Sequence, residues 1–282
     1  MPDPRPEASA YARPATLTEA LGLLGLGGWQ VLAGGTDLYP GAGSQLSGPV
    51  LDLSGIAGFA GITAEDGLRI GAATSWATIA GAVLPPAMQA LQQAARVVGG
   101  RQVQVAGTIG GNLCNASPAA DGVPPLLALD AEVELVSRSG MRRLGLSDFI
   151  LGPRRTALMP WELLAAVVIP ERALAGRSAF VKLGARSHLV ISIAMVAARV
   201  QVRAGRIAGA ALAVGACSAV AVRLPMVEAA VVGAPVDRAG DRIRAADVAA
   251  ALSPIDDVRG TAGYRADAAV ELLRRAVAGA LA

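Results

Sequence analysis

Several residue types are scarce in this chain of 282 residues, and each scarcity excludes a class of function. Cysteine occurs only at Cys114 and Cys217, whereas an iron–sulfur cluster needs about four thiolates. We therefore expect any cluster to lie in another chain, and we expect both thiols to be free. Histidine and lysine occur once each, as His188 and Lys182, so the sequence shows no cluster of metal ligands.

Aromatic residues and excess charge are scarce as well. Aromatics make up 3% of the chain, the net charge is only +3, and the arginines are scattered instead of gathering with aromatic side chains. A nucleic-acid site needs a clustered basic surface, so the sequence argues against one despite an isoelectric point near 9.3.

Long apolar runs are also missing, although 53% of the residues are hydrophobic and the mean hydropathy is +0.49. A membrane-spanning helix needs roughly 18 to 20 such residues in a row. The best candidates, residues 189–198 and 207–222, are short or broken by glycine and are more typical of buried strands. The first residues show no basic segment followed by an apolar one, so we expect no secretory signal and a cytoplasmic location.

The order of apolar and glycine-rich segments predicts two domains. The chain is longer than a usual single domain, which has about 100 to 200 residues. Residues 1–173 mix short strands with helices, and we expect subdomains at about 1–55 and 56–173. Beyond a linker, residues 174–282 predict a small antiparallel sheet backed by helices, one of them over 267–281. The predicted fold class is therefore α+β.

The first candidate site is a glycine pair directly after an expected strand over residues 29–33. Gly34 and Gly35 lack a Cβ, so several backbone N–H groups there can approach an anion to within about 3 Å, and Thr36 adds a hydroxyl donor. A tight turn explains this loop equally well by itself. The loop matches neither the GxGxxG fingerprint nor the P-loop, which disfavours a nicotinamide Rossmann site and a Walker-type NTPase.

A second glycine pair, Gly110 and Gly111, lies in a polar stretch over residues 107–125 that we expect to be an ordered loop without regular structure. Backbone N–H groups and amides there can bind phosphate oxygens, and a carboxylate can accept hydrogen bonds from ribose hydroxyls. The side chains that supply this chemistry are Asn112, Asn115, Ser117 and Asp121. Together, the two loops predict a nucleotide site.

With these loops, the sequence resembles the flavin subunit of the xanthine dehydrogenase and carbon monoxide dehydrogenase family, the molybdenum hydroxylases. The resemblance rests on residues 33–37, 107–113 and 116–121, and it extends over nearly the whole chain through anchors at 68–72, 164–170, 180–184 and 260–265. It implies a two-part FAD-binding domain of the vanillyl-alcohol-oxidase type, followed by a small C-terminal α/β domain. It also implies FAD as the cofactor.

The resemblance further implies which residues hold the FAD. Both loops would grip its pyrophosphate, and Asp121 would lie on the ribose side. Leu164 and Lys182 would meet the flavin end, where a cation stabilises negative charge on the ring. An ordinary surface lysine is the alternative for Lys182. The expected set is Val31, Leu32, Ala33, Gly34, Gly35, Thr36, Asp37, Leu38, Val98, Thr108, Ile109, Gly110, Gly111, Asn112, Asn115, Asp121, Leu164 and Lys182.

Two residues near the expected cofactor have open roles. After Arg186 the xanthine dehydrogenases carry acidic residues, whereas residues 187–192 here read Ser-His-Leu-Val-Ile-Ser, so the electron acceptor is not identified. His188 could touch the flavin edge or be structural. Cys114, inside the second loop, could approach the cofactor, and we expect it to be a packed and inert thiol instead.

The function implied by the resemblance is electron transfer within a molybdenum hydroxylase. The expected partners are a small subunit with two-iron two-sulfur clusters and a large subunit with the molybdopterin cofactor, in a dimer of heterotrimers. The FAD of this chain would pass their electrons to NAD, a quinone, a cytochrome or oxygen. Two alternatives stay open: a stand-alone FAD oxidase or reductase of the same fold, and a non-catalytic assembly subunit whose loops are only turns. We expect no catalytic residue and no metal ligand in this chain.

Overall fold

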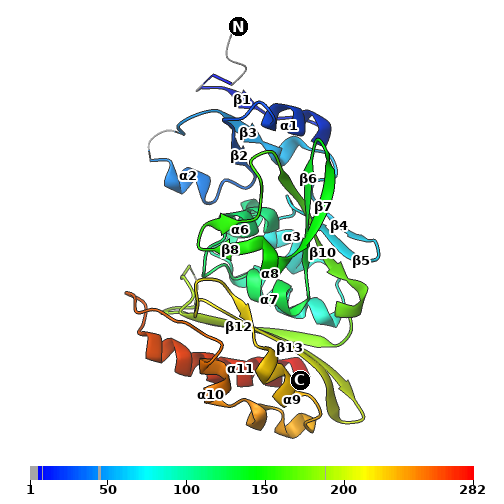
Figure 1. The fold of residues 1–282 in the computed structure, drawn as a ribbon, viewed down its shortest axis with the longest axis vertical. Coiled ribbons are helices and arrows are strands. Elements are labelled where there is room, and N and C mark those ends of the chain that lie inside the picture. Colours follow the sequence, from blue (N-terminus) through cyan, green and yellow to red (C-terminus); the bar gives the residue numbers. More distant parts are fainter. Residues whose placement is uncertain (1–5, 8, 44–45, 188) are drawn as a thin grey trace.

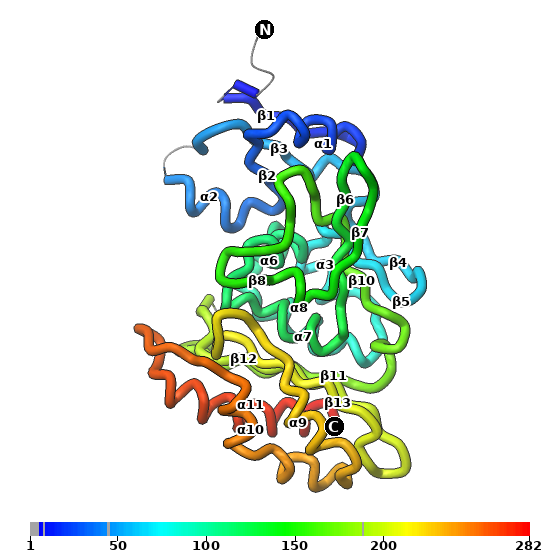
Figure 2. Tube along the Cα trace, in the orientation of Figure 1, coloured from blue at the N-terminus to red at the C-terminus, as the bar shows by residue number. Residues whose placement is uncertain are grey.

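The computed structural model describes residues 6–7, 9–43, 46–187 and 189–282. Three sheets follow one another along the long axis of the molecule, with the amino terminus at one end and the C-terminal helices at the other (Figure 1). The trace in Figure 2 shows the same order, from blue through green to red. We call them the N-terminal, middle and C-terminal sheets.

The N-terminal sheet is small and parallel. Its strands, in spatial order, are β1 (Tyr11–Ala12), β3 (Val50–Asp52) and β2 (Gln30–Leu32). Helix α1 (Leu17–Leu24) begins where the Thr16 hydroxyl accepts a hydrogen bond from the Glu19 N–H at 3.2 Å, as expected for an N-cap. Because β2 ends at Leu32, the first glycine loop starts at the carboxyl end of a strand and leads into the short helix α2 (Leu38–Gly41).

The middle sheet is antiparallel and carries most of the core. In spatial order its strands are β4 (Ile62–Ala64), β5 (Gly67–Gly71), β10 (Leu163–Pro170), β6 (Glu132–Ser137) and β7 (Gly140–Gly145). The run from Leu163 to Ile169 is buried at every position, which explains why it lacks the alternation of a half-exposed strand. Five helices lie between β5 and β6 in sequence: α3 (Trp76–Gly81), α4 (Gln89–Val97), α5 (Arg101–Ala106), α6 (Ile109–Asn115) and α7 (Val123–Ala128). A shorter helix, α8 (Leu146–Phe149), and the hairpin of β8 (Ile150–Gly152) and β9 (Arg155–Thr156) precede β10.

The expectation of an irregular loop over residues 107–125 was wrong, because this stretch contains α6 and the start of α7. Thr108 caps α6 by accepting a hydrogen bond from the Gly111 N–H at 3.0 Å. Ile109 and Leu113, four residues apart on one face, are both fully buried. Burial of this face and a good cap therefore outweigh the low helix propensity of the glycine pair.

The C-terminal sheet is a four-stranded antiparallel meander. Its strands are β11 (Arg177–Leu183), β12 (Ala194–Arg203), β13 (Arg206–Gly215) and β14 (Val222–Arg223). Helices α9 (Pro225–Val231), α10 (Ala245–Ala249) and α11 (Ala262–Leu281) follow, and α11 packs on β11 and β12. The other face of the sheet contacts α4 and α7. The predicted α+β fold, with a small antiparallel sheet and helices at its carboxyl end, is confirmed.

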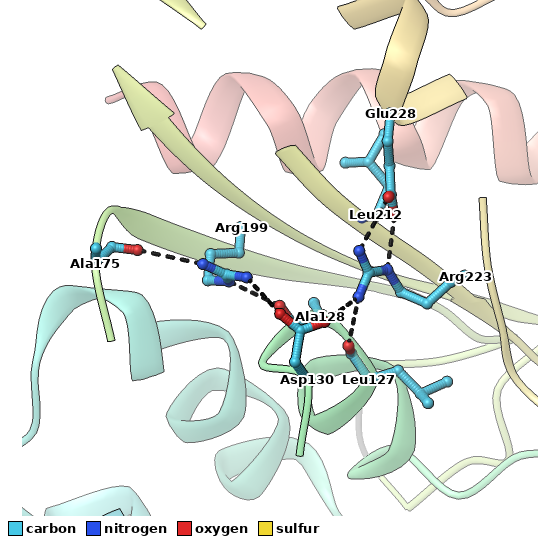
Figure 3. A network of polar contacts seen from close by, with 8 residues as sticks. All are labelled: Leu127, Ala128, Asp130, Ala175, Arg199, Leu212, Arg223 and Glu228. Atoms are coloured by element: carbon cyan, nitrogen blue, oxygen red, sulfur yellow. Dashed lines mark hydrogen bonds and ion pairs between the residues drawn. The ribbon is translucent and has the colours of Figure 1, made fainter. Parts of the chain in front are cut away.

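Two arginines of the C-terminal sheet hold the end of α7 (Figure 3). Arg199 Nε donates to the carbonyl of Ala128 at 2.7 Å, and Arg223 Nη1 donates to the carbonyl of Leu127 at 2.9 Å. The carboxylate of Asp130 accepts from both guanidinium groups, at 3.1 and 2.7 Å. The last carbonyls of a helix need such donors, so this network fixes the C-terminal sheet to the middle part of the chain.

Candidate functional site

A cleft of about 550 Å³ runs along the junction of the N-terminal and middle sheets. Its wall is formed by residues 31–38, which run from the end of β2 to the start of α2, by α6 and its flanks, and by the start of β10, with Ile191 added from the segment before β12. Fifteen residues of the expected cofactor set line it: Val31, Leu32, Ala33, Gly34, Gly35, Thr36, Asp37, Leu38, Val98, Thr108, Gly110, Gly111, Asn112, Asn115 and Leu164.

The two glycine segments touch each other at Gly34. A Cβ built on Gly34 would lie 2.7 Å from the carbonyl carbon of Ala106 and 2.9 Å from Gly107 Cα, which no real side chain tolerates. Asn115 Nδ2 also donates to Asp37 Oδ1 at 2.7 Å. Segments some seventy residues apart in sequence therefore form one continuous surface, which the sequence alone could only suggest.

The first loop offers unpaired backbone donors to the cleft. Among the described residues, the N–H groups of 34–38 find no acceptor in the protein. Gly35 has φ +69°, a left-handed conformation that glycine adopts without strain and that turns successive N–H groups to one side. The loop therefore has the form of an anion-binding nest.

The second glycine pair, whose N–H groups were expected to bind phosphate, belongs to the first turn of α6. The four N–H groups of the first turn of α6 already have acceptors, including Thr74 O for Ile109 and Ala72 O for Gly110. A Cβ on Gly110 would meet Ala72 at 2.7 Å, whereas one on Gly111 would meet only the Thr108 hydroxyl, at 3.0 Å. Gly110 thus lets α6 pack closely, and Gly111 keeps the cleft open.

One buried acceptor in the cleft wall has no partner. Asn112 Oδ1 is inaccessible to solvent, and no donor among the described residues reaches it. Leaving such a group unpaired costs about 1–3 kcal/mol, so the site gains from a ligand that supplies a donor here. Apolar side chains cover other parts of the wall, among them Phe59, Val98, Leu164 and Ile191. A cleft with an anion nest, an orphan acceptor and apolar walls fits a dinucleotide with an aromatic ring system.

Three residues of the expected set lie outside the cleft lining. Ile109 is fully buried in the core. Asp121 is 7% exposed, and its two oxygens already accept hydrogen bonds from Lys182 Nζ and Ser192 Oγ, both at 2.6 Å. Burial raises the pKa of Asp121, and the Lys182 ammonium opposes this effect. With a side chain only 12% exposed, Lys182 is no ordinary surface lysine.

A second hollow, of about 740 Å³, is lined by Val97, whereas the next residue, Val98, lines the cleft. It is lined by the end of α4, by β11 from Phe180 to Leu183, and by Gly184, Arg186 and Ser187. Lys182 therefore faces this hollow while it pairs with Asp121. His188, for which a contact with the flavin edge was considered, lies outside the described residues.

Sequence reasoning missed Glu162, Arg154 and Trp76 as cleft residues. Glu162 is 7% exposed and accepts hydrogen bonds from Arg142 Nε at 2.6 Å and from the Met159 N–H at 3.0 Å. The hydrogen bonds from Arg142 lower the pKa of Glu162, so it stays ionised. No local pattern in the sequence marks these residues, since each reaches the cleft only through tertiary packing.

Both cysteines are free thiols, as expected. Cys114 lines the cleft and is exposed there, so the expectation of a packed thiol was wrong, while desolvation by the surrounding cleft raises the pKa of its thiol to about 12. A protonated thiol is a poor nucleophile, in line with an inert role. Within the described residues, no group of histidine, cysteine and carboxylate side chains is placed to hold a metal ion. None of the helices in the described parts of the chain is both long and apolar enough to span a membrane.

Two family models cover nearly the whole chain. The model described as the FAD binding domain in molybdopterin dehydrogenase matches residues 7–172, and the model described as the CO dehydrogenase flavoprotein C-terminal domain matches residues 179–280.

Relatives of known name agree with these models. The chain is 32% identical to the xanthine dehydrogenase FAD-binding subunit of Escherichia coli O157:H7, with 81% of each chain covered. It is 31% identical to the nicotine 6-hydroxylase medium subunit of Paenarthrobacter nicotinovorans, with 96% of each covered. Among solved structures, a chain of CO dehydrogenase from Oligotropha carboxidovorans superposes with a TM-score of 0.87 at 29% identity, covering 96% of this chain and 97% of that one.

Proposed function

The chain belongs to the family of FAD-binding subunits of molybdenum hydroxylases, and we propose that it holds FAD in the cleft and passes electrons from a partner's iron–sulfur clusters to an external acceptor. The observation that carries the proposal is the run of N–H groups at 34–38 that have no acceptor among the described residues, set beside the unpaired Asn112 Oδ1 in one cleft. Leaving the buried Asn112 Oδ1 unpaired is costly, and the N–H groups, on partly exposed residues, can exchange water for an anion.

Each part of the cleft has a task in holding the cofactor. The nest at 34–38 binds the pyrophosphate, because backbone N–H groups within about 3 Å of an anion form charge-assisted hydrogen bonds. Asn112 Oδ1 accepts a hydrogen bond from the cofactor, and Val98 and Leu164 keep water from the ring. Bound FAD supplies one- and two-electron redox chemistry, which the side chains of this protein lack.

The Lys182–Asp121 pair, whose lysine lines the second hollow, is proposed to act on the flavin end. Its ammonium charge, partly screened by Asp121 at 2.6 Å, raises the local potential on that side. Ser192 donates to the second oxygen of Asp121 and fixes the orientation of the pair. These residues position a positive charge, and no proton transfer by them is needed for electron transfer.

The partners are proposed from the relatives, which are medium or FAD-binding subunits of multi-subunit dehydrogenases and hydroxylases. We propose a small subunit with two-iron two-sulfur clusters and a large molybdopterin subunit, assembled as a dimer of heterotrimers. The cytoplasm stays the predicted compartment. Co-purification of the tagged chain with both partners supports this assembly, and turnover of an organic substrate by the isolated chain contradicts it.

Replacing Gly111 by valine tests the placement of the cofactor. The added side chain meets only the Thr108 hydroxyl, at 3.0 Å, and otherwise takes up cleft space that the cofactor would fill. We expect Gly111→Val to lose FAD after gel filtration while its far-ultraviolet circular dichroism stays that of the wild type. Gly263→Val is the control, since Gly263 also lies in a first helical turn but outside the cleft lining, and nothing lies near its Cβ position. Normal FAD content in Gly111→Val contradicts the placement.

A further inference from the structure

Arg154 is the one positively charged side chain among the described residues that line the cleft. The other charged lining residues are two carboxylates, Asp37 and Glu162. Arg142 neutralises Glu162 at 2.6 Å, whereas Asp37 has the neutral amide of Asn115 as its described partner. A diphosphate entering the cleft therefore meets one carboxylate without a cation, and Arg154 is the only cation among the described lining residues that offsets the repulsion.

The backbone holds Arg154 at the edge of the cleft under strain. Its N–H donates to the carbonyl of Ala116 at 2.9 Å. Both residues are left-handed, with φ +58° for Arg154 and +45° for Ala116. Residues other than glycine adopt this conformation rarely and at a cost, and such strain gathers where function needs it. The turn between β8 and β9 is thus fixed to the end of α6.

The guanidinium of Arg154 is linked to the first loop through Asn115. Arg154 Nη1 donates to the side-chain oxygen of Asn115, and Asn115 Nδ2 donates to Asp37 Oδ1 at 2.7 Å. We call Arg154, Asn115 and Asp37 the polar strap. It joins the β8–β9 turn to the loop that carries the free N–H groups, so the guanidinium lies one amide group away from that loop.

We propose that Arg154 is the counter-ion of the cofactor's diphosphate and that it makes the cleft select FAD over a flavin without phosphates. The inference rests on the proposed function. A guanidinium presents donors in a planar fork that matches phosphate oxygens. Its present side-chain partner is a neutral amide oxygen, so Arg154 turns to a phosphate without breaking an ion pair.

Arg155 provides a matched control for the test. It is the next residue, it is exposed, it lies outside the cleft lining, and its guanidinium makes no hydrogen bond to any described residue. Dissociation constants for FAD and for riboflavin, which lacks both phosphates, are measured by flavin fluorescence on the full-length apo chain. The variants are Arg154→Gln, Arg154→Lys and Arg155→Gln.

We expect Arg154→Gln to weaken FAD binding by about 10- to 100-fold, the usual worth of a charge-assisted hydrogen bond, and to leave riboflavin binding unchanged. Arg155→Gln should leave both unchanged, and Arg154→Lys should keep most of the preference for FAD. Wild-type affinity for FAD in Arg154→Gln, or an equal loss for riboflavin, overturns the inference.

Two further outcomes separate the inference from its premise. If Arg154→Gln fails to fold, Arg154→Lys decides, because a variant that keeps the charge but loses the preference for FAD also overturns the inference. A wild-type chain that binds neither flavin refutes the proposed function instead. Equal melting temperatures of the apo variants show that the cleft itself is intact.

Discussion

Replacing Gly34 by alanine should separate the two segments of the cofactor cleft. The backbone of Gly34 is not left-handed, so alanine adopts it without strain, and any cost comes from the space. The new methyl group would lie 2.7 Å from the carbonyl carbon of Ala106, well inside van der Waals contact with backbone that cannot rotate away. Overpacking of this kind costs about 1–3 kcal/mol.

Urea denaturation of the apo chain should therefore show the free energy of unfolding of Gly34→Ala lowered by about 1–3 kcal/mol, with FAD binding at least about tenfold weaker. Gly22→Ala is the control, since Gly22 lies within α1 with nothing near its Cβ position. In a helix this change stabilises by about 0.5–1 kcal/mol, so the two variants should shift in opposite directions. Wild-type stability and FAD affinity in Gly34→Ala would refute the contact between the segments.

Three other changes test the surroundings of the cleft. Arg223→Ala should lower the free energy of unfolding by about 2–3 kcal/mol, less than the loss of a fully buried ion pair, because Arg223 is partly exposed. Arg238→Ala, at an exposed ion pair, should lower it by under about 0.5 kcal/mol. Urea denaturation compares the two variants, and equal losses would contradict the role of the network in Figure 3. Since Arg142 lowers the pKa of Glu162, the Glu162 carboxylate stabilises the fold above its unfolded pKa of 4.5, and this contribution is lost as the pH falls through the folded pKa. Glu162→Gln should therefore flatten the decline in the free energy of unfolding below about pH 5. An unchanged decline would contradict the lowered pKa of Glu162. Because the pKa of its thiol is raised to about 12, Cys114 should react with iodoacetamide at pH 8 far more slowly than cysteine in solution. Mass spectrometry measures the labelling, and rapid labelling in the apo chain would contradict the raised pKa.

Local signals in the sequence were sufficient for the elements that local interactions determine. The cap of α1 and the buried run of β10 are of this kind, because a cap needs one side chain and a buried strand needs one apolar run. The helix α6 could not, because two glycines and polar neighbours argue against a helix, and its stability comes from burying Ile109 and Leu113.

The candidate site was predictable in its residues but not in their division of tasks. Gly34, Gly110 and Gly111 look alike in sequence. Backbone packs against Gly34 and Ala72 packs against Gly110, whereas only the Thr108 hydroxyl lies near the Cβ position of Gly111. Likewise, nothing near Arg154 in sequence predicts that it reaches the first loop through Asn115. Such contacts depend on tertiary approach, which a single sequence does not specify.

The flavin content of the purified full-length chain tests the central claim most directly. We expect a yellow protein that releases one FAD per chain on acid precipitation, measured by its absorbance and by chromatography, or an apo chain that recovers this stoichiometry when FAD is added. A colourless chain that is folded by circular dichroism and fails to bind added FAD would contradict it.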